Sequence, residues 1–121
     1  MPNIIVVDDD ITNVQLLQML LELDGFAVQA FTSLEQAMSN ITAQTNAFVV
    51  DWHLERNTSG LDLLQAVRQG KTAAAIDTAF IISSGDHRRE KEALEAGANH
   101  FLLKPYPPEQ LSQLLAALVQ S

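Results

Sequence analysis

The chain has 121 residues, with 7 Lys and Arg against 15 Asp and Glu, so its formal net charge at pH 7 is −8. This length suits one domain, and a hydrophobic content of 47% is enough to build a core. The acidic balance argues against nucleic-acid binding, and the absence of cysteine excludes disulfides, thiolate metal sites and a cysteine nucleophile. There is no secretory signal and no stretch of about 20 apolar residues, so we expect a cytoplasmic chain that does not associate with membranes.

Short runs of β-branched and aromatic residues alternate with helical patterns along the chain. The runs predict five strands, at Ile4–Val7, Ala27–Phe31, Ala47–Val50, Ala79–Ile82 and His100–Leu103. A helical pattern follows each strand: leucines from Leu16 to Leu21 that stop at Gly25, a run from Leu34 to Ile41 behind Ser33, a run from Leu61 to Val67 closed by Gly70, a weaker pattern over Arg88–Ala96 and leucines from Leu111 to Leu118.

This fivefold strand–helix alternation predicts a single α/β domain over residues 1–121. The expected architecture is flavodoxin-like, a doubly wound (βα)5 domain with a five-stranded parallel sheet. Four of the runs are nearly all apolar, as strands buried on both faces should be, whereas Gln29 marks the second run as an edge. The strand order 2-1-3-4-5 fits this pattern, with the functional crevice at the carboxyl ends of the strands.

Polar residues follow four of the five predicted strands: Asp8, Asp9 and Asp10, then Asp51, then Ser83 and Ser84, and finally Lys104. In a doubly wound sheet they converge on one crevice. Two carboxylates about 4 Å apart repel by about 4 kcal/mol at an effective dielectric constant of about 20, so the cluster needs cations. Lys104 supplies one positive charge. Oxygen ligands without His or Cys favour Mg²⁺, with Mn²⁺ as the alternative, and such an ion points to phosphoryl chemistry.

These residues resemble the receiver domain of two-component response regulators, the CheY-like family. The resemblance runs through the whole chain and rests on four motifs in order: Ile4–Asp9, Val49–Asp51, Ala96–Ala98 and Leu102–Pro105. Asn13, five residues after Asp8, is most similar to receivers attached to hybrid kinases.

The resemblance implies a phosphorelay function for the site. Asp51 would accept a phosphoryl group from a histidine kinase or a histidine phosphotransfer protein. The ligands of Mg²⁺ would be Asp8, Asp9, Asp51 and the backbone carbonyl of His53. Lys104 and Ser83 would contact the phosphoryl oxygens, and Pro105 is expected to follow a cis peptide bond. The chain would not be an enzyme beyond its own phosphoryl acceptance and slow autodephosphorylation.

The resemblance also implies an output surface. Ser83 and Phe101 would form a switch that changes the face built from the fourth helix, fifth strand and fifth helix. That face would contact a protein effector or a linked output domain, and it is the expected surface for a homodimer.

Two spacings depart from the family pattern. Nine positions separate Asp51 from Gly60, one more than expected, and the usual proline of that loop is missing. The distance from Ser83 to Gly97 is one residue short, so Ser84 stays open as the switch hydroxyl.

Two other functions compete with this interpretation. A phosphatase of the haloacid-dehalogenase type would use Asp8 as nucleophile and Asp10 as general acid/base, but it would leave Asp51 without a role, and Asp10 also suits a helix N-cap. A receiver-shaped adaptor would bind partners without phosphorylation. Trp52, beside the site, is expected to be either a loop lid or part of the core.

Overall fold

The computed structural model describes residues 1–119, in which five parallel strands alternate with five α-helices. The strands are β1 (Asn3–Val7), β2 (Ala27–Phe31), β3 (Thr45–Asp51), β4 (Ala79–Ser84) and β5 (His100–Leu103). The helices are α1 (Ile11–Leu23), α2 (Leu34–Met38), α3 (Gly60–Arg68), α4 (Glu90–Glu95) and α5 (Pro108–Val119), with a short 3₁₀ turn at His87–Arg89 before α4. The strand order is β2-β1-β3-β4-β5, which confirms the predicted fold.

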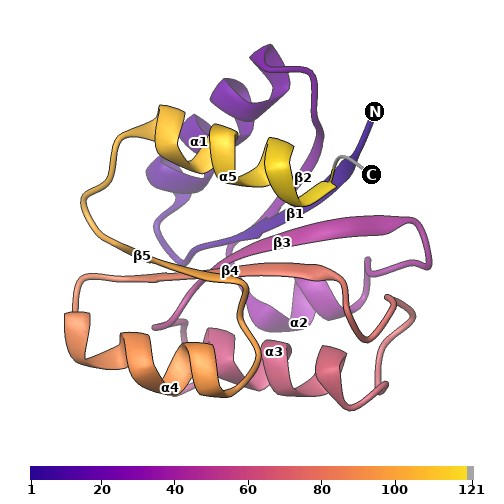
Figure 1. Ribbon diagram of the computed structural model, residues 1–121, viewed down its shortest axis with the longest axis vertical. Helices are drawn as coiled ribbons and strands as arrows, with labels where there is room; N and C mark the ends of the chain where they lie inside the picture. Colours follow the sequence, from indigo (N-terminus) through magenta and orange to yellow (C-terminus); the bar gives the residue numbers. More distant parts are fainter. Residues whose placement is uncertain (120–121) are drawn as a thin grey trace.

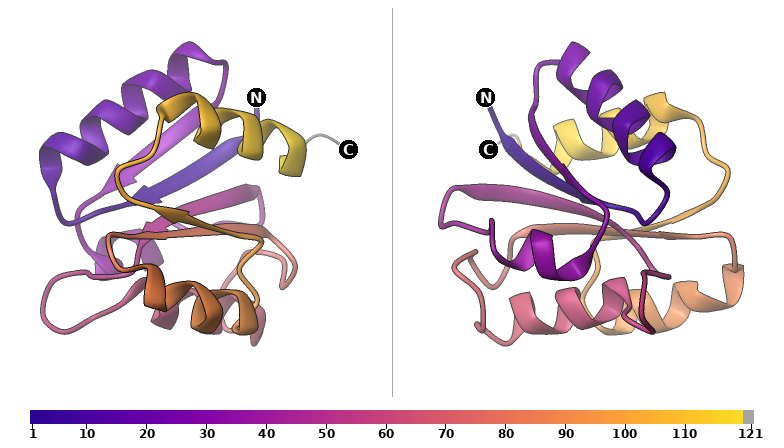
Figure 2. Two further views of the ribbon diagram at one scale, coloured as in Figure 1. Left: turned by 60° about the vertical axis from the view of Figure 1, so that its left-hand side comes forward. Right: turned by 180° about the vertical axis from the view of Figure 1, so that it is seen from behind.

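Helices cover both faces of the sheet, as Figures 1 and 2 show: α1 and α5 lie on one face, and α2, α3 and α4 on the other. Successive strand residues point to opposite faces, so two separate hydrophobic clusters form. One contains Ile4, Val6, Val49 and Ile81 with the apolar side chains of α1 and α5. The other contains Val7, Val50, Phe80 and Ile82 with those of α3 and α4. This alternation also determines to which face of the sheet each site residue points.

The sheet has two edges with different character from the central strands. β2 is one edge, as predicted, and Gln29 on it is exposed. β5 is the other edge, as the predicted strand order has it, but the expectation from its apolar run that it is buried on both faces is wrong: Leu102 is buried and Leu103 is 48% exposed. An edge strand lacks a neighbour on one side, so the helices cover it less completely.

Local capping defines the start of the helices near the site. Asp10 caps α1, accepting hydrogen bonds from the backbone amides of Thr12 and Asn13, and this assigns it the structural role of an N-cap. Ser59 caps α3 in a reciprocal capping box with Asp62. Within residues 1–119, none of the helices combines the length and apolarity needed to cross a bilayer.

Candidate functional site

The carboxyl ends of β1 and β3 bring three aspartates together. One carboxylate oxygen from each of Asp8, Asp9 and Asp51 lies within 4.8 Å of the others. Asp8 and Asp51 are 3% and 9% exposed, while Asp9 is on the surface. The site therefore holds two buried acidic groups beside one that solvent reaches.

Lys104 reaches this cluster from the end of β5. Its Nζ lies 2.9 Å from Oδ2 of Asp8, a hydrogen-bonded ion pair, and 3.4 Å from Oδ2 of Asp51. The peptide bond between Lys104 and Pro105 is cis, as predicted. One ammonium thus neutralises part of the charge of two carboxylates, and the three carboxylates keep an excess of negative charge.

Burial and charge shift the protonation of these groups. Burial raises the pKa of Asp51, the positive charge of Lys104 opposes that rise, and the negative charge of Asp8 adds to it. Burial works against the charged form of Lys104, but its hydrogen bond to Asp8 and the charge of Asp51 outweigh it and raise the pKa of Lys104. Burial and the charge of Asp8 therefore disfavour the ionised form of Asp51, despite the nearby charge of Lys104.

The all-oxygen donor set of this cluster fits a hard divalent ion. Asp8, Asp9 and Asp51 would hold Mg²⁺ there, since carboxylates are its preferred protein ligands and the cluster lacks enough positive charge of its own. His53, whose carbonyl was predicted as a further ligand, follows β3 directly. Its side chain is exposed, and its backbone forms an antiparallel bridge with Ser59.

The loop after β3, which is one residue longer than the family pattern predicts, contains a tight turn. Thr58 N donates to the carbonyl of Glu55, and the two residues between them, Arg56 and Asn57, both have positive φ. This is the pattern of a type I′ turn, which needs no proline. Gly60 still lies against the backbone of Asp51, where a Cβ would be 2.5 Å from the Asp51 carbonyl oxygen.

The two candidate switch hydroxyls lie on opposite faces of the sheet. Ser83 pairs with Asp51 in the β3–β4 register. It points to the same face of the sheet as Ile81, two residues earlier, and so lies on the face of the carboxylates. Ser84 points to the same face as Ile82, the α3/α4 face. Its Oγ accepts a hydrogen bond from the amide of Asp86 at 3.0 Å. The Ser84 hydroxyl therefore stabilises the turn after β4.

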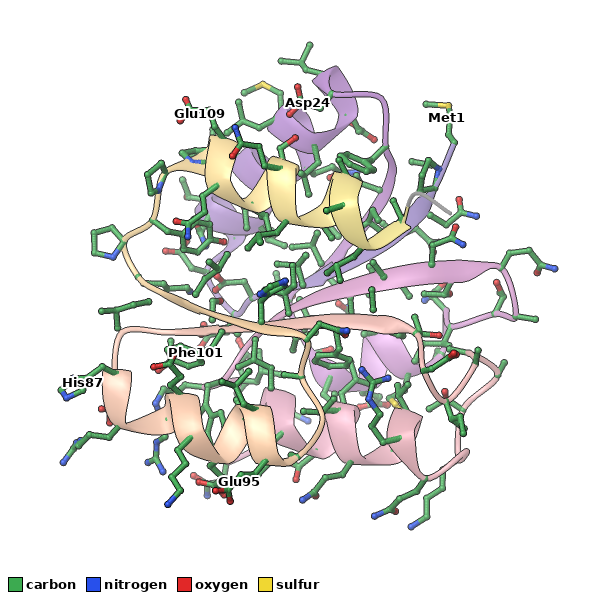
Figure 3. All side chains as sticks on the ribbon, in the orientation of Figure 1. Met1, Asp24, His87, Glu95, Phe101 and Glu109 are labelled. Carbon is green, nitrogen blue, oxygen red and sulfur yellow. The ribbon has the colours of Figure 1, made fainter. Side chains whose placement is uncertain are left out.

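Phe101 and Trp52 lie on the α3/α4 face and not among the carboxylates. Phe101 of β5 is partly buried against the cluster on that face, and Figure 3 shows it between the sheet and α4. Trp52 is 6% exposed in the same cluster, so it is core rather than a lid. The Arg89 guanidinium carbon lies 5.2 Å from the centre of the Trp52 ring, in cation–π contact.

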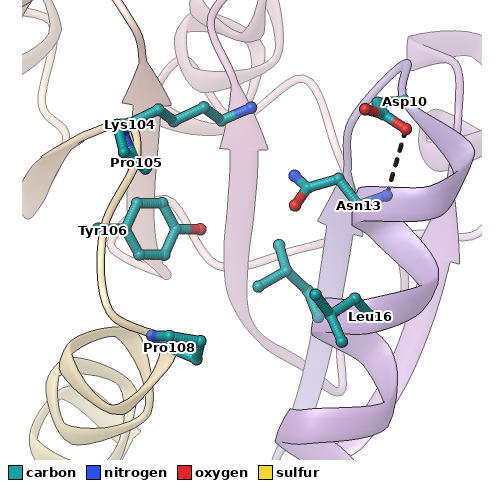
Figure 4. Close-up of a pocket in the computed structure, with 8 residues that line it drawn as sticks. Asp10, Asn13, Leu16, Lys104, Pro105, Tyr106 and Pro108 are labelled. Atoms are coloured by element: carbon teal, nitrogen blue, oxygen red, sulfur yellow. Dashed lines mark hydrogen bonds between the residues drawn. The ribbon is translucent and has the colours of Figure 1, made fainter.

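A cavity of about 460 Å³ opens beside the cluster, between α1 and the segment after β5 (Figure 4). Asn13, Lys104, Pro105 and Tyr106 contribute to its lining. Burial raises the pKa of Tyr106 to about 12, with help from the charges of Asp8 and Asp51, so its hydroxyl is protonated at neutral pH. Neither Tyr106 nor Asn13 directly follows a strand, so the pattern of polar residues after strands does not predict a site role for them.

Comparison with known proteins agrees with this geometry. The sequence model of the response regulator receiver domain matches residues 4–116. The chain belongs to the response regulator receiver family. Receiver domains are signalling modules rather than classical enzymes, and they bind Mg²⁺ at an aspartate cluster of the kind formed here by Asp8, Asp9 and Asp51.

Individual relatives differ in length. The chain is 25% identical to the phosphate regulon transcriptional regulatory protein PhoB of Pseudomonas aeruginosa over 118 residues, covering 97% of this chain but 51% of PhoB. It is 27% identical to chemotaxis protein CheY1 of Helicobacter pylori strain 26695, covering 96% of this chain and 95% of CheY1. A crystal structure of a receiver domain protein from Clostridium thermocellum superposes with a TM-score of 0.87 at 25% identity, over 98% of this chain and 94% of that one.

Receiver-family membership and the capped position of Asp10 disfavour the phosphatase alternative. The Asp10 carboxylate accepts hydrogen bonds from two backbone amides of α1 and is engaged in the cap rather than free for proton transfer. Asp51, which that alternative leaves without a role, is a member of the cluster.

Proposed function

We propose that Asp51 is the phosphoacceptor of this receiver domain and that a phosphohistidine of a partner kinase or phosphotransfer protein is the donor. The observation that carries the proposal is the position of Lys104, within 3.4 Å of the Asp51 carboxylate and hydrogen-bonded to Asp8. A buried carboxylate beside one cation and two further acids suits a reaction whose main requirement is charge neutralisation.

The reaction is a transfer of the phosphoryl group from nitrogen to oxygen. A carboxylate oxygen of Asp51 attacks phosphorus, the P–N bond breaks, and its electron pair stays on the imidazole nitrogen, which takes a proton from solvent. An acyl phosphate forms. Lys104 pairs with a phosphoryl oxygen, and Ser83 donates a hydrogen bond to another. Mg²⁺ held by Asp8, Asp9, Asp51 and the His53 carbonyl would neutralise charge on the phosphoryl group.

The output surface proposed for the phosphorylated chain is the face of α4, β5 and α5. Leu94 of α4 and Leu103 of β5 are 44% and 48% exposed there, which supports contact with an effector, an output domain or a second copy. Ser83 and Phe101 would couple the site to this face. A cytoplasmic location is part of the same proposal.

The proposal is tested by incubating the chain with Mg²⁺ and phosphoramidate and measuring its intact mass. We expect one added phosphoryl group in the natural sequence and none in Asp51→Asn. Labelling that persists in Asp51→Asn and disappears in Asp8→Asn would contradict the proposal in favour of the phosphatase. No labelling of the natural sequence would favour the adaptor.

A further inference from the structure

Asn13 contacts the acidic cluster from the first turn of α1. Its side-chain Nδ2 donates to Oδ2 of Asp8 at 2.5 Å. Lys104 Nζ donates to the same oxygen at 2.9 Å. In Figure 4 the two side chains extend toward each other from α1 and from the end of β5. A neutral amide and a charged ammonium therefore share one carboxylate oxygen.

The hydrogen bonds of Asp8 leave little capacity on that oxygen. A carboxylate oxygen has two lone pairs, and the two donors occupy both on Oδ2. The other oxygen, Oδ1, accepts one bond from the amide of Asp10 at 3.0 Å. The acceptor capacity that remains on Asp8 is on Oδ1, while any stronger bond to Asn13 weakens the bond to Lys104.

The local needs of the helix do not explain this contact. The cap of α1 uses the backbone amide of Asn13 and the side chain of Asp10, so the Asn13 amide group is not needed for it. The amide group of Asn13 is instead directed at a carboxylate that is 3% exposed.

We infer that Asn13 is a positioning residue that controls how Lys104 divides its charge between Asp8 and Asp51. By holding Oδ2 of Asp8, the Asn13 amide weakens the attachment of Lys104 to Asp8 and leaves the ammonium able to turn to the phosphoryl group on Asp51. It does this without adding charge to the cluster. The inference rests on the proposed function, since it assigns Lys104 to the phosphoryl group.

The kinetic test uses Asn13→Ala in two backgrounds, the natural sequence and Lys104→Met, with phosphoramidate at saturating Mg²⁺. We expect Asn13→Ala to slow phosphorylation about tenfold in the natural sequence. In Lys104→Met it should slow phosphorylation no further, because Asn13 acts through Lys104. The matched control is Gln15→Ala, an exposed residue of the same helix, which should leave the rate unchanged. Equal slowing in both backgrounds would overturn the inference.

Mg²⁺ affinity separates positioning of Lys104 from positioning of the metal. Trp52 fluorescence during Mg²⁺ titration should give nearly the same dissociation constant for Asn13→Ala and the natural sequence. A loss of affinity as large as the loss of rate would assign Asn13 to the metal site and overturn the role through Lys104.

A metal-free measurement keeps the inference distinct from the proposed function. In EDTA, the urea midpoint should fall more in the double variant Asn13→Ala/Lys104→Met than the two single variants predict together, because Oδ2 of the buried Asp8 then loses both donors. Additive shifts would contradict the shared-oxygen arrangement. If the natural sequence is not phosphorylated at all, the proposed function fails, whereas this cycle still reports on Asn13.

Discussion

At the scale of single residues, alternation along a strand separates neighbours into different tasks. Asp51 and Trp52 are adjacent, but Asp51 joins the carboxylates under α1 and α5 while Trp52 packs in the opposite cluster. Ser83 and Ser84 divide in the same way. At the end of a strand, one residue therefore points to the carboxylate site and the next points to the hydrophobic cluster on the α3/α4 face.

The two serines give a direct test of this division. Ser83→Ala should keep phosphorylation at Asp51 but lose the structural response, because the hydroxyl on the carboxylate face is removed. Ser84→Ala should lower the free energy of unfolding by about 1 kcal/mol, since the partly buried amide of Asp86 loses its acceptor, and should keep the response. Intact mass, urea unfolding and ¹H–¹⁵N spectra measure the three effects. Loss of the response in Ser84→Ala alone would contradict the assignment.

Asp51 should also affect stability in a pH-dependent way. Its pKa is raised in the folded chain, so the folded state binds the proton more tightly than the unfolded state, and the ionised carboxylate destabilises the fold. That penalty is absent below the unfolded pKa of about 4 and grows as the pH rises through the folded pKa. In EDTA at pH 7 we expect Asp51→Asn to unfold at higher urea, by about 1 kcal/mol, and the difference to vanish at acid pH.

Addition of Mg²⁺ supplies the control for that prediction. Binding to the folded site stabilises the natural sequence by mass action and should reduce or reverse its disadvantage, since Asp51→Asn has one ligand less. Lower stability of Asp51→Asn than of the natural sequence at pH 7 in EDTA would show that the pairing with Lys104 outweighs burial.

At the scale of secondary-structure elements, Arg68 joins three of them. From the end of α3 its Nη1 donates to the carbonyls of Ile76 and Thr78, each at 2.7 Å, ahead of β4. Its Nε donates to the carbonyl of Gly97 at 3.0 Å, between α4 and β5. Burial lowers the pKa of Arg68, and the nearby Asp77 opposes the shift. This side chain holds the end of α3 to the segment before β4 and to the turn between α4 and β5.

Loss of Arg68 should therefore be severe for a residue at a helix end. We expect Arg68→Met to reduce the free energy of unfolding by about 2–4 kcal/mol, because it leaves three carbonyls without a donor. Arg68→Lys should recover little of this, since one ammonium cannot span the three carbonyls. The control is Arg88→Met, whose exposed ion pair with Asp86 contributes less than about 1 kcal/mol. Urea unfolding measures all three, and equal effects of Arg68→Met and Arg88→Met would contradict the role.

At the scale of the whole molecule, contacts on both faces of the sheet lie between the site and the proposed output face. The cation–π contact of Arg89 with Trp52 joins the end of β3 to the segment before α4, and the amide of Trp52 donates to the carbonyl of Ser83 at 2.8 Å. Under the proposed function, we expect a change at Asp51 to reach α4 through Ser83 and through Trp52.

This connection predicts where phosphorylation changes the spectrum. In ¹H–¹⁵N spectra recorded before and after phosphoramidate, we expect shifts at the site, along α4 and β5, and around Trp52 and Arg89. The far end of α1 and the exposed end of α2 should change little. Asp51→Asn treated in the same way is the control and should show no change along α4. Shifts confined to the aspartates and Lys104 would contradict the proposed output face.

The sequence by itself determined the fold and the acidic cluster. Both depend on local signals: hydrophobic runs at strand and helix spacing, and polar residues directly after strands, which any parallel sheet brings to one edge. The acidic cluster and Lys104 were therefore predictable before any contact was known, as was Asp10 as the cap of α1. The predicted strand order also placed β5 at an edge, but the apolar run of β5 did not predict that Leu103 is exposed, because such a run has the same composition at an edge and in the centre.

Tertiary structure alone decided the finer arrangement of the site. The register of β3 with β4 places Ser83 and not Ser84 beside Asp51, and a shift of one residue would exchange the two. The approach of α1 to the sheet brings Asn13 to Asp8, and the loop after β3 turns back at Arg56 and Asn57. These features depend on distances between segments far apart in the chain, which residue spacing does not encode.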